Sequence, residues 1–248
     1  MEPGDLRIPR VFVELPLGKE TRVELPPGPA RHIAQVLRLR AGDSLILFDG
    51  EGRDYPGHLL VATRGRAQVA IGSPTEVEPQ ATLAVHLGIG VSKGDRMDYA
   101  IQKAVELGVA RLCPLFTRRS VVRLDEARLE KRQGHWRGVV VAACEQSGRR
   151  RLPELASATS LERWLTLDHP CPLLLDHRST MPLHQISAPA GEMTFLVGPE
   201  GGLAPEERTR AQGSGFTPVR LGPRVLRTET APLAALAAAQ TLWGDFRD

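Results

Sequence analysis

The sequence predicts an α/β protein with a mostly parallel sheet, preceded by a small β domain. From Ala81 onwards, strand-like and helix-like segments alternate at the spacing of βαβ units, which indicates a parallel sheet with helices on both faces. Two strand-like runs, residues 193–197 and 218–221, each stop at a glycine and each lead into a helix-like segment. An open α/β sheet builds its ligand site from such strand ends.

Composition and charge restrict the class of protein. With 42% hydrophobic and 25% charged residues, the 248-residue chain has the composition of one or two globular domains. Its formal net charge is only +3, but arginines cluster at residues 118–119, 123 and 149–151. Such clusters are typical of a surface that binds a polyanion, and they are also compatible with a surface that is simply solvated. The three cysteines are far apart and lack metal-ligand spacing, so we expect no metal site, no disulfide framework and a reducing cytoplasm. We also expect no signal peptide and no membrane span.

Residues 1–73 are predicted to form a small β-barrel of the kind that binds nucleic acid through an exposed face. Its strands are expected at residues 10–13, 21–25, 44–48, 55–62 and 67–71. One helix is predicted over residues 29–39, where Ile33, Val36 and Leu37 have helical spacing. His32 and Arg38 on this helix are candidates to contact a nucleic-acid backbone, although side chains that are simply solvated are the plainer interpretation. Residues 72–79 contain two prolines and are predicted to be a linker.

Residues 80–248 are predicted to form the α/β domain. Its strands are expected at residues 82–91, 109–116, 172–175, 193–197 and 218–221. Its helices are expected at residues 96–107, 125–147, 161–165 and 228–246, with a further helix opened by Pro205.

The first glycine turn is Gly198-Pro199-Glu200-Gly201-Gly202. It lacks the spacing of a dinucleotide fingerprint and the ending of a phosphate loop. Glycine lets backbone groups approach a ligand closely, so the expected ligand is a neutral heteroaromatic ring or a ribose rather than a triphosphate. The alternative is a tight turn without a ligand, and a second Gly-Pro turn at residues 222–223 shifts the balance towards a ligand site.

Three charged residues, Arg224, Arg227 and Glu229, lie between the second turn and the last helix. Thr228 is predicted to cap that helix, and Glu229 to complement its dipole. Glu229 is also a candidate to hold one arginine rigid, because an oriented guanidinium stabilises negative charge that develops on a substrate. The two roles of Glu229 are compatible.

Four motifs in the same order resemble the RsmE family, the ribosomal small-subunit uridine-N3 methyltransferases. They are KGDRM at 93–97, EQSGR at 145–149, GPEGG at 198–202 and LGPRVLRTETA at 221–231. The segment HIAQVLRLRAGD at 32–43 resembles the PUA-like RNA-binding barrel of the same family, so the resemblance covers nearly the whole chain.

The resemblance implies a methyltransferase of the SPOUT superfamily, in which the C-terminal chain forms a trefoil knot that pattern alone would not suggest. It implies S-adenosylmethionine as cofactor, a homodimer, and methylation of a 16S rRNA uridine at N3. The motifs of the family imply that the cofactor is bound by residues of the two turns, and Leu175 is expected to form an apolar wall beside them. The implied cofactor-binding residues are Leu175, Gly198, Glu200, Gly201, Gly202, Leu221, Gly222, Leu226 and Arg227.

The chemistry of the acceptor suggests the catalytic residues. Uracil N3 must lose a proton, and the resulting charge spreads over the flanking carbonyl oxygens. Arg224 and Arg227 are predicted to stabilise that charge. Glu229 is a candidate general base, although pairing with an arginine would lower its pKa, and water or hydroxide is the alternative base.

The RNA is expected to contact basic residues of both domains: Arg10, His32, Arg38, Lys93, Arg119, Arg123, Arg149, Arg150 and Arg151. Arg118 departs from the family, which commonly has an acidic residue there, and its role is left open. Two other functions stay under consideration: a related knotted enzyme that acts on a ribose 2′-hydroxyl or on tRNA, and a non-enzymatic RNA-binding assembly factor.

Overall fold

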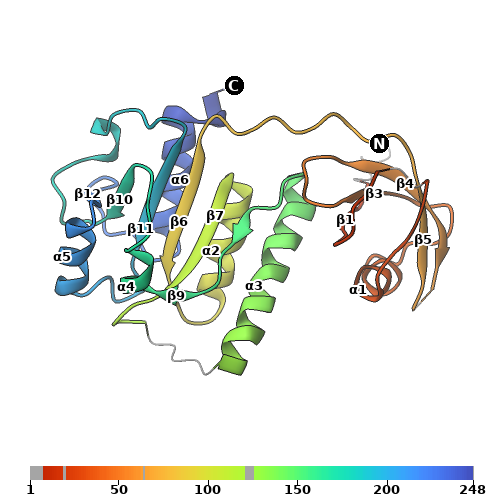
Figure 1. Ribbon diagram of the computed structural model, residues 1–248, viewed down its shortest axis with the longest axis horizontal. Coiled ribbons are helices and arrows are strands. Elements are labelled where there is room, and N and C mark those ends of the chain that lie inside the picture. Colours follow the sequence, from red (N-terminus) through yellow and green to blue (C-terminus); the bar gives the residue numbers. More distant parts are fainter. Residues whose placement is uncertain (1–7, 19–20, 64, 121–125, 248) are drawn as a thin grey trace, which may run out of the picture. The chain divides into compact units, whose positions relative to one another are not determined.

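The computed structural model describes residues 8–18, 21–63, 65–120 and 126–247 (Figure 1). Its contacts divide the chain into two compact units. The first is Met1–Pro79 with Cys144–Leu152, and the second is Gln80–Ala143 with Pro153–Asp248. No helix in the described part of the chain is both long and apolar enough to cross a membrane.

The first unit is built on a five-stranded sheet. Its strands are β1 (Arg10–Phe12), β2 (Arg22–Glu24), β3 (Ser44–Phe48), β4 (Tyr55–Ala62) and β5 (Ala67–Ile71), in the order β1-β3-β4-β5-β2. The β1–β3 pair is parallel and the other pairs are antiparallel. Alternate residues such as Leu45, Leu47 and Val69 point into one core, as the period of two predicts.

The helical segment of this unit differs from the single helix predicted over residues 29–39. The helix α1 (Pro27–Arg31) is followed by the π-helix η1 (His32–Leu37), which ends at Arg38. A π-helix bonds residue i to i+5, so residues three and four apart no longer share one face. Ile33 is therefore fully buried while Val36 is 66% exposed.

The second unit is an α/β layer structure around a sheet of parallel strands. Its main strands are β6 (Ala84–Gly90), β7 (Val109–Phe116), β10 (Pro172–Leu175), β11 (Glu192–Val197) and β12 (Thr217–Val219). The order is β12-β10-β11-β6-β7-β8, where β8 is Glu154–Leu155, and the short β9 (Thr159–Ser160) pairs with β7. All pairings in this sheet are parallel, which confirms the predicted fold class.

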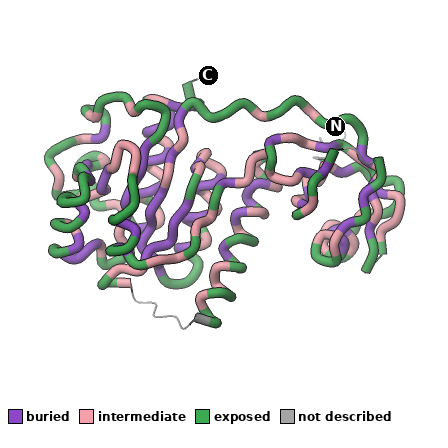
Figure 2. Tube along the Cα trace, in the orientation of Figure 1, coloured by how far each residue is buried: buried purple, intermediate pink, exposed green. Residues whose placement is uncertain are grey.

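Helices cover both faces of this sheet, as expected for a parallel sheet whose strands are buried on both sides. The helices α2 (Asp95–Glu106) and α6 (Thr230–Trp243) contact each other, and α6 also contacts β6 and β11. On the other face, α4 (Leu161–Trp164) and α5 (Pro205–Gly213) contribute Trp164 and Ala211 to a core with Leu174 and Leu196. The remaining helical segments are α3 (Glu126–Ser147), η2 (Leu183–Gln185) and η3 (Asp245–Arg247). Buried positions follow the central strands (Figure 2).

Candidate active site

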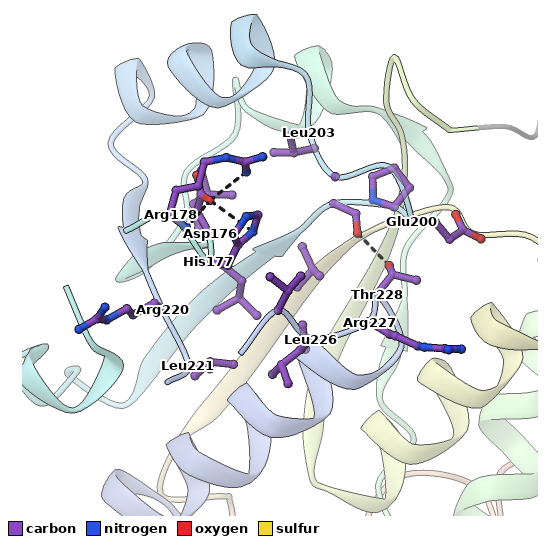
Figure 3. Close-up of a pocket in the computed structure, with 18 of the residues that line it drawn as sticks. Asp176, His177, Arg178, Glu200, Leu203, Arg220, Leu221, Leu226, Arg227 and Thr228 are labelled. Carbon is purple, nitrogen blue, oxygen red and sulfur yellow. Dashed lines mark hydrogen bonds and ion pairs between the residues drawn. The ribbon is translucent and has the colours of Figure 1, made fainter. Parts of the chain in front are cut away.

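The register of the parallel sheet brings four strand ends to one level. Val197 of β11 pairs with Ile89 of β6, Leu196 pairs with Leu174 of β10, and Leu175 pairs with Val219 of β12. The residues that follow these strands therefore meet at the carboxyl edge of the sheet, where open α/β sheets bind ligands. They surround a cavity of about 240 Å³ (Figure 3).

The turn that follows β11 packs backbone against backbone. A Cβ atom on Gly198 would lie 2.8 Å from the amide nitrogen of Leu203, and one on Gly90 would lie 2.4 Å from the nitrogen of Pro199. Gly202 has a φ of +66°, which favours glycine, and its amide donates to the carbonyl of Pro199 at 2.7 Å. Glycine is therefore required here for packing as well as for any ligand.

Glu200 fastens this turn to the segment that leads from β6 into α2. Its carboxylate accepts hydrogen bonds from the amide of Lys93 (2.9 Å) and from Arg96 (3.3 Å). Burial by itself would raise the pKa of Glu200, but these hydrogen bonds hold it below its usual value. The side chain thus shapes the cavity wall through its hold on the turn.

The stretch that follows β12 forms the opposite wall. Leu221 and Leu226 line the cavity together with Leu175 and Leu203, so much of the wall is apolar (Figure 3). Gly222, which we predicted as a cofactor-binding residue, lines a neighbouring groove instead of this cavity. The other predicted cofactor-binding residues, Gly198, Glu200, Gly201, Gly202 and Arg227 included, are gathered around it.

Thr228 has a different role from the predicted helix cap. Glu229 occupies the cap position of α6 without a side-chain cap, and the buried Thr228 hydroxyl donates to the carbonyl of Gly198 at 2.9 Å. The same hydroxyl lies 3.4 Å from Ser92 Oγ, which donates to the carbonyl of Gly90. Thr228 therefore joins the two turns and the end of β6.

The three predicted catalytic residues separate in the structure. Arg224 and Arg227 line the cavity and are exposed, whereas Glu229 is not among the lining residues. Within the described residues, no ion pair joins Glu229 to either arginine. Glu229 therefore sits at the start of α6, while the arginines are available to a ligand.

An arginine-bearing loop after β7 closes another side of the cavity. Arg119, a predicted RNA contact, donates to the carbonyl of Gly201 at 2.7 Å. The preceding Arg118 pairs with Glu206 on α5, and its amide donates to the buried Glu207 at 2.7 Å. Arg118 thus connects the loop to α5, which accounts for a basic residue at this position.

Sequence reasoning missed Asp176, which lines the cavity directly after β10. Its carboxylate is 10% exposed and lies 3.4 Å from Arg178 and 3.7 Å from Arg208 on α5. Figure 3 shows this cluster on the side of the cavity away from Arg227. An acidic residue directly after a buried strand was the available signal, because the strand ends of a parallel sheet meet at its ligand site.

The predicted RNA contacts in the first unit fall into two groups. Arg10 is held inside the unit: it pairs with Asp54 at 2.6 Å, donates to the carbonyls of Cys144 and Arg149, and lies over the Phe48 ring. Its side chain is only 9% exposed, so the structure gives Arg10 a structural role. Arg150 likewise donates to Thr75 and to the Glu76 carbonyl.

The other predicted RNA contacts differ in exposure. Arg38 and Lys93 are exposed, and His32 is partly buried near Glu145. Arg149 is partly buried and Arg151 donates to the carbonyl of Glu78, while Arg123 lies outside the described residues. The described residues contain no group of three or more histidine, cysteine or acidic side chains that could hold a metal ion.

Comparison with known proteins agrees with this architecture. Residues 79–240 match the RNA methyltransferase domain family, and residues 30–72 match the RNA methyltransferase PUA domain family. Proteins called ribosomal RNA small subunit methyltransferase E are similar along most of the chain. The protein from Buchnera aphidicola is 30% identical and the match covers 97% of this chain and 98% of the relative. The protein from Bacillus subtilis is 31% identical and the match covers 92% of this chain and 94% of the relative.

Two solved structures match nearly the whole fold. The ribosomal RNA small subunit methyltransferase E from Neisseria gonorrhoeae, bound to S-adenosyl methionine, has a TM-score of 0.89 with 38% identity over 96% of this chain and 99% of its own. A Legionella pneumophila protein in complex with the bound cofactor SAM has a TM-score of 0.93 with 34% identity over 97% and 100%. The chain therefore belongs to the RsmE family of ribosomal RNA small subunit methyltransferases.

Proposed function

We propose that this protein transfers the methyl group of S-adenosylmethionine to N3 of a uridine in 16S rRNA. The observation that carries the proposal is the cavity at the carboxyl edge of the parallel sheet, between the glycine turn that follows β11 and the stretch that follows β12. The two relatives solved with this cofactor, which match the fold over nearly the whole chain, support it.

The residues around the cavity fit this cofactor. Its adenine is neutral and flat, which suits backbone amides and carbonyls near Gly198 and Gly202 and the apolar walls Leu203 and Leu226. The carboxylate of Asp176 adds a hydrogen-bond acceptor on one side of the cavity. When bound, the cofactor supplies an electrophilic methyl group.

The arginines of the second turn perform the electrostatic part of the reaction in this proposal. Uracil N3 loses its proton to water, and the negative charge that remains on the flanking oxygens is stabilised by Arg224 and Arg227. Glu229 takes no part in the proton transfer, because it does not line the cavity. Most of the remaining rate enhancement comes from holding N3 in line with the methyl group.

A homodimer completes the proposal, and an apolar groove beside the cavity supports it. The groove is lined by Leu183 and Leu226, and by Ala234, Ala238 and Leu242 of α6. Leu242 and Val225 are exposed large apolar side chains, at 37% and 71% exposure. We expect the partner subunit to cover this groove.

Two further expectations belong to the proposal. The chain between β11 and α6 is expected to form the trefoil knot. The enzyme is expected to act in the cytoplasm, where ribosomes are assembled.

Transfer of a labelled methyl group in vitro tests this function. The protein is incubated with S-adenosylmethionine and either naked 16S rRNA or small subunits, and the RNA is digested to nucleosides. We expect label in 3-methyluridine. Label in a 2′-O-methylated nucleoside or only in tRNA would identify a different acceptor, and calorimetric titration without any cofactor binding would indicate an RNA-binding assembly factor.

A further inference from the structure

The π-helix of the first unit presents an unusual surface. Two fully buried side chains hold the turn His32–Leu37 against the core of the unit: Ala30, just before the turn, and Ile33, within it. It is closed by hydrogen bonds from the amides of Arg38 and Leu39 to the carbonyl of Ile33. The turn is therefore held in place, and what it exposes is set by the fold.

Two features of this turn are unusual: its C-cap residue is a left-handed arginine, and it exposes an apolar side chain. Arg38 has a φ of +56°, in the left-handed region that an arginine rarely adopts. Val36 is 66% exposed, although it lies only three residues from the buried Ile33. Backbone outliers and π-helical turns in rigid settings concentrate at functional sites.

The surroundings of Val36 are basic. Arg31, Arg38 and Arg40 are exposed, and within the part of the chain that the structure describes none of their side chains forms an ion pair or a hydrogen bond. Two acidic side chains near this segment each accept a backbone amide. Asp43 accepts the amide of Arg40, and Glu145, near His32, accepts the amide of Phe12.

From these observations we infer that Val36 and the three arginines form one contact surface for unpaired RNA, in which the arginines hold phosphates and Val36 packs on an unstacked base. Guanidinium groups match phosphate geometry, and sequence-selective RNA contacts are made mostly to unstacked bases in loops and bulges. This inference rests on the proposed function, because it locates the rRNA contact of the first unit. We call these four residues, Arg31, Val36, Arg38 and Arg40, the Val36 surface.

Variants of the full-length protein separate the two kinds of contact. Affinity for a 16S rRNA transcript is measured by fluorescence anisotropy at several salt concentrations, without S-adenosylmethionine. We expect V36S to raise the Kd at least roughly threefold with an unchanged salt slope, since an apolar contact releases no counterions. The matched control is V77S, which alters an exposed valine between β5 and β6 and should change neither quantity.

The Arg38→Gly variant distinguishes a binding role from a structural one. Glycine adopts positive φ freely, so this variant should melt at or above the temperature of the wild type. It should nevertheless bind the transcript more weakly, with a salt slope reduced by about 0.7 to 0.9, the loss of one phosphate contact. Arg66→Ala, which removes an exposed arginine already paired with Glu24, should leave the slope unchanged.

The inference would be overturned if both V36S and R38G bound the transcript with the affinity and the salt slope of the wild type. A change in vesicle binding or in self-association, without a change in RNA affinity, would overturn it as well. Because affinity is measured without the cofactor, these outcomes are independent of methyl transfer. A wild-type protein that binds RNA through the Val36 surface but transfers no methyl group would contradict only the proposed function.

Discussion

The hydroxyl of Thr228 donates a 2.9 Å hydrogen bond to the carbonyl of Gly198 and thereby joins the two turns that form the cavity. The two residues are thirty positions apart in the chain, and Thr228 is buried. This bond fixes the separation of the two walls between which the cofactor is proposed to bind. Its removal should therefore affect binding more than folding.

Thr228→Val keeps the shape of the side chain and removes this hydrogen bond. Because a buried hydrogen bond contributes about 1 kcal/mol, we expect calorimetry to show a Kd for S-adenosylmethionine that is higher by roughly fivefold. Thr228→Ser should restore the wild-type affinity. Thr166→Val removes a similar bond to the carbonyl of Arg163, outside the cavity lining, and should leave the Kd unchanged. Equal affinities of the Val and Ser variants would contradict this role.

Gly198→Ala should lower the free energy of unfolding. The added Cβ would lie 2.8 Å from the nitrogen of Leu203 and 2.9 Å from the carbonyl carbon of Gly202, and backbone cannot move aside as a flexible side chain can. We expect a loss of about 1–3 kcal/mol in urea denaturation. Gly138→Ala is the control, because it lies in α3 with nothing within 4 Å of the new Cβ, and it should gain about 1 kcal/mol. A neutral Gly198→Ala would show that the turn is looser than described.

Glu200 should contribute stability that depends on pH. Its folded-state pKa lies below the ordinary value of 4.5, so the ionised carboxylate stabilises the folded protein at higher pH. We expect the free energy of unfolding of the wild type to exceed that of Glu200→Gln above pH 4.5. The difference should disappear as the pH falls through the lowered folded-state pKa. Denaturation curves over this range measure it, and a difference that grows on acidification would have the wrong sign.

Arg224 and Arg227 should contribute to the rate of methyl transfer. Removal of one preorganised charge that stabilises a transition state typically lowers kcat by at least about 100-fold. We expect an effect of this size for Arg227→Ala, a fall for Arg224→Ala, and little change for Glu229→Ala, which lies outside the cavity lining. Arg210→Ala, on the surface of α5, is the control. Single-turnover kinetics would contradict the proposal if both arginine variants reacted at the wild-type rate.

The sequence alone predicted the parallel sheet and the place of the site. Strands β7 and β10 have the predicted bounds because each is a short apolar run between clear turn signals. The site follows from strand direction, since the ends of parallel strands meet at one edge. Periodicity could not predict the π-helix, because the pattern at Ile33 and Val36 is also that of an α-helix.

Long-range polar contacts were beyond the reach of local pattern. Nothing near Thr228 indicates that its hydroxyl bonds to Gly198 rather than to its own helix, and nothing near Arg10 indicates Asp54 as its partner. The place of Asp176 directly after β10 was a local signal, but its contact with Arg208 on α5, far along the chain, was not predictable from local pattern. The cofactor and the rRNA substrate came from family motifs, which physical pattern does not supply.

Mapping of rRNA modification in cells tests the central claim most directly. 16S rRNA is purified from a strain that lacks the gene for this protein, and from the same strain complemented with the wild type or with Arg227→Ala, and its nucleosides are located by mass spectrometry. We predict that one 3-methyluridine is absent in the deletion strain, returns with the wild type and does not return with the variant. A complete set of 3-methyluridines in the deletion strain would contradict the claim.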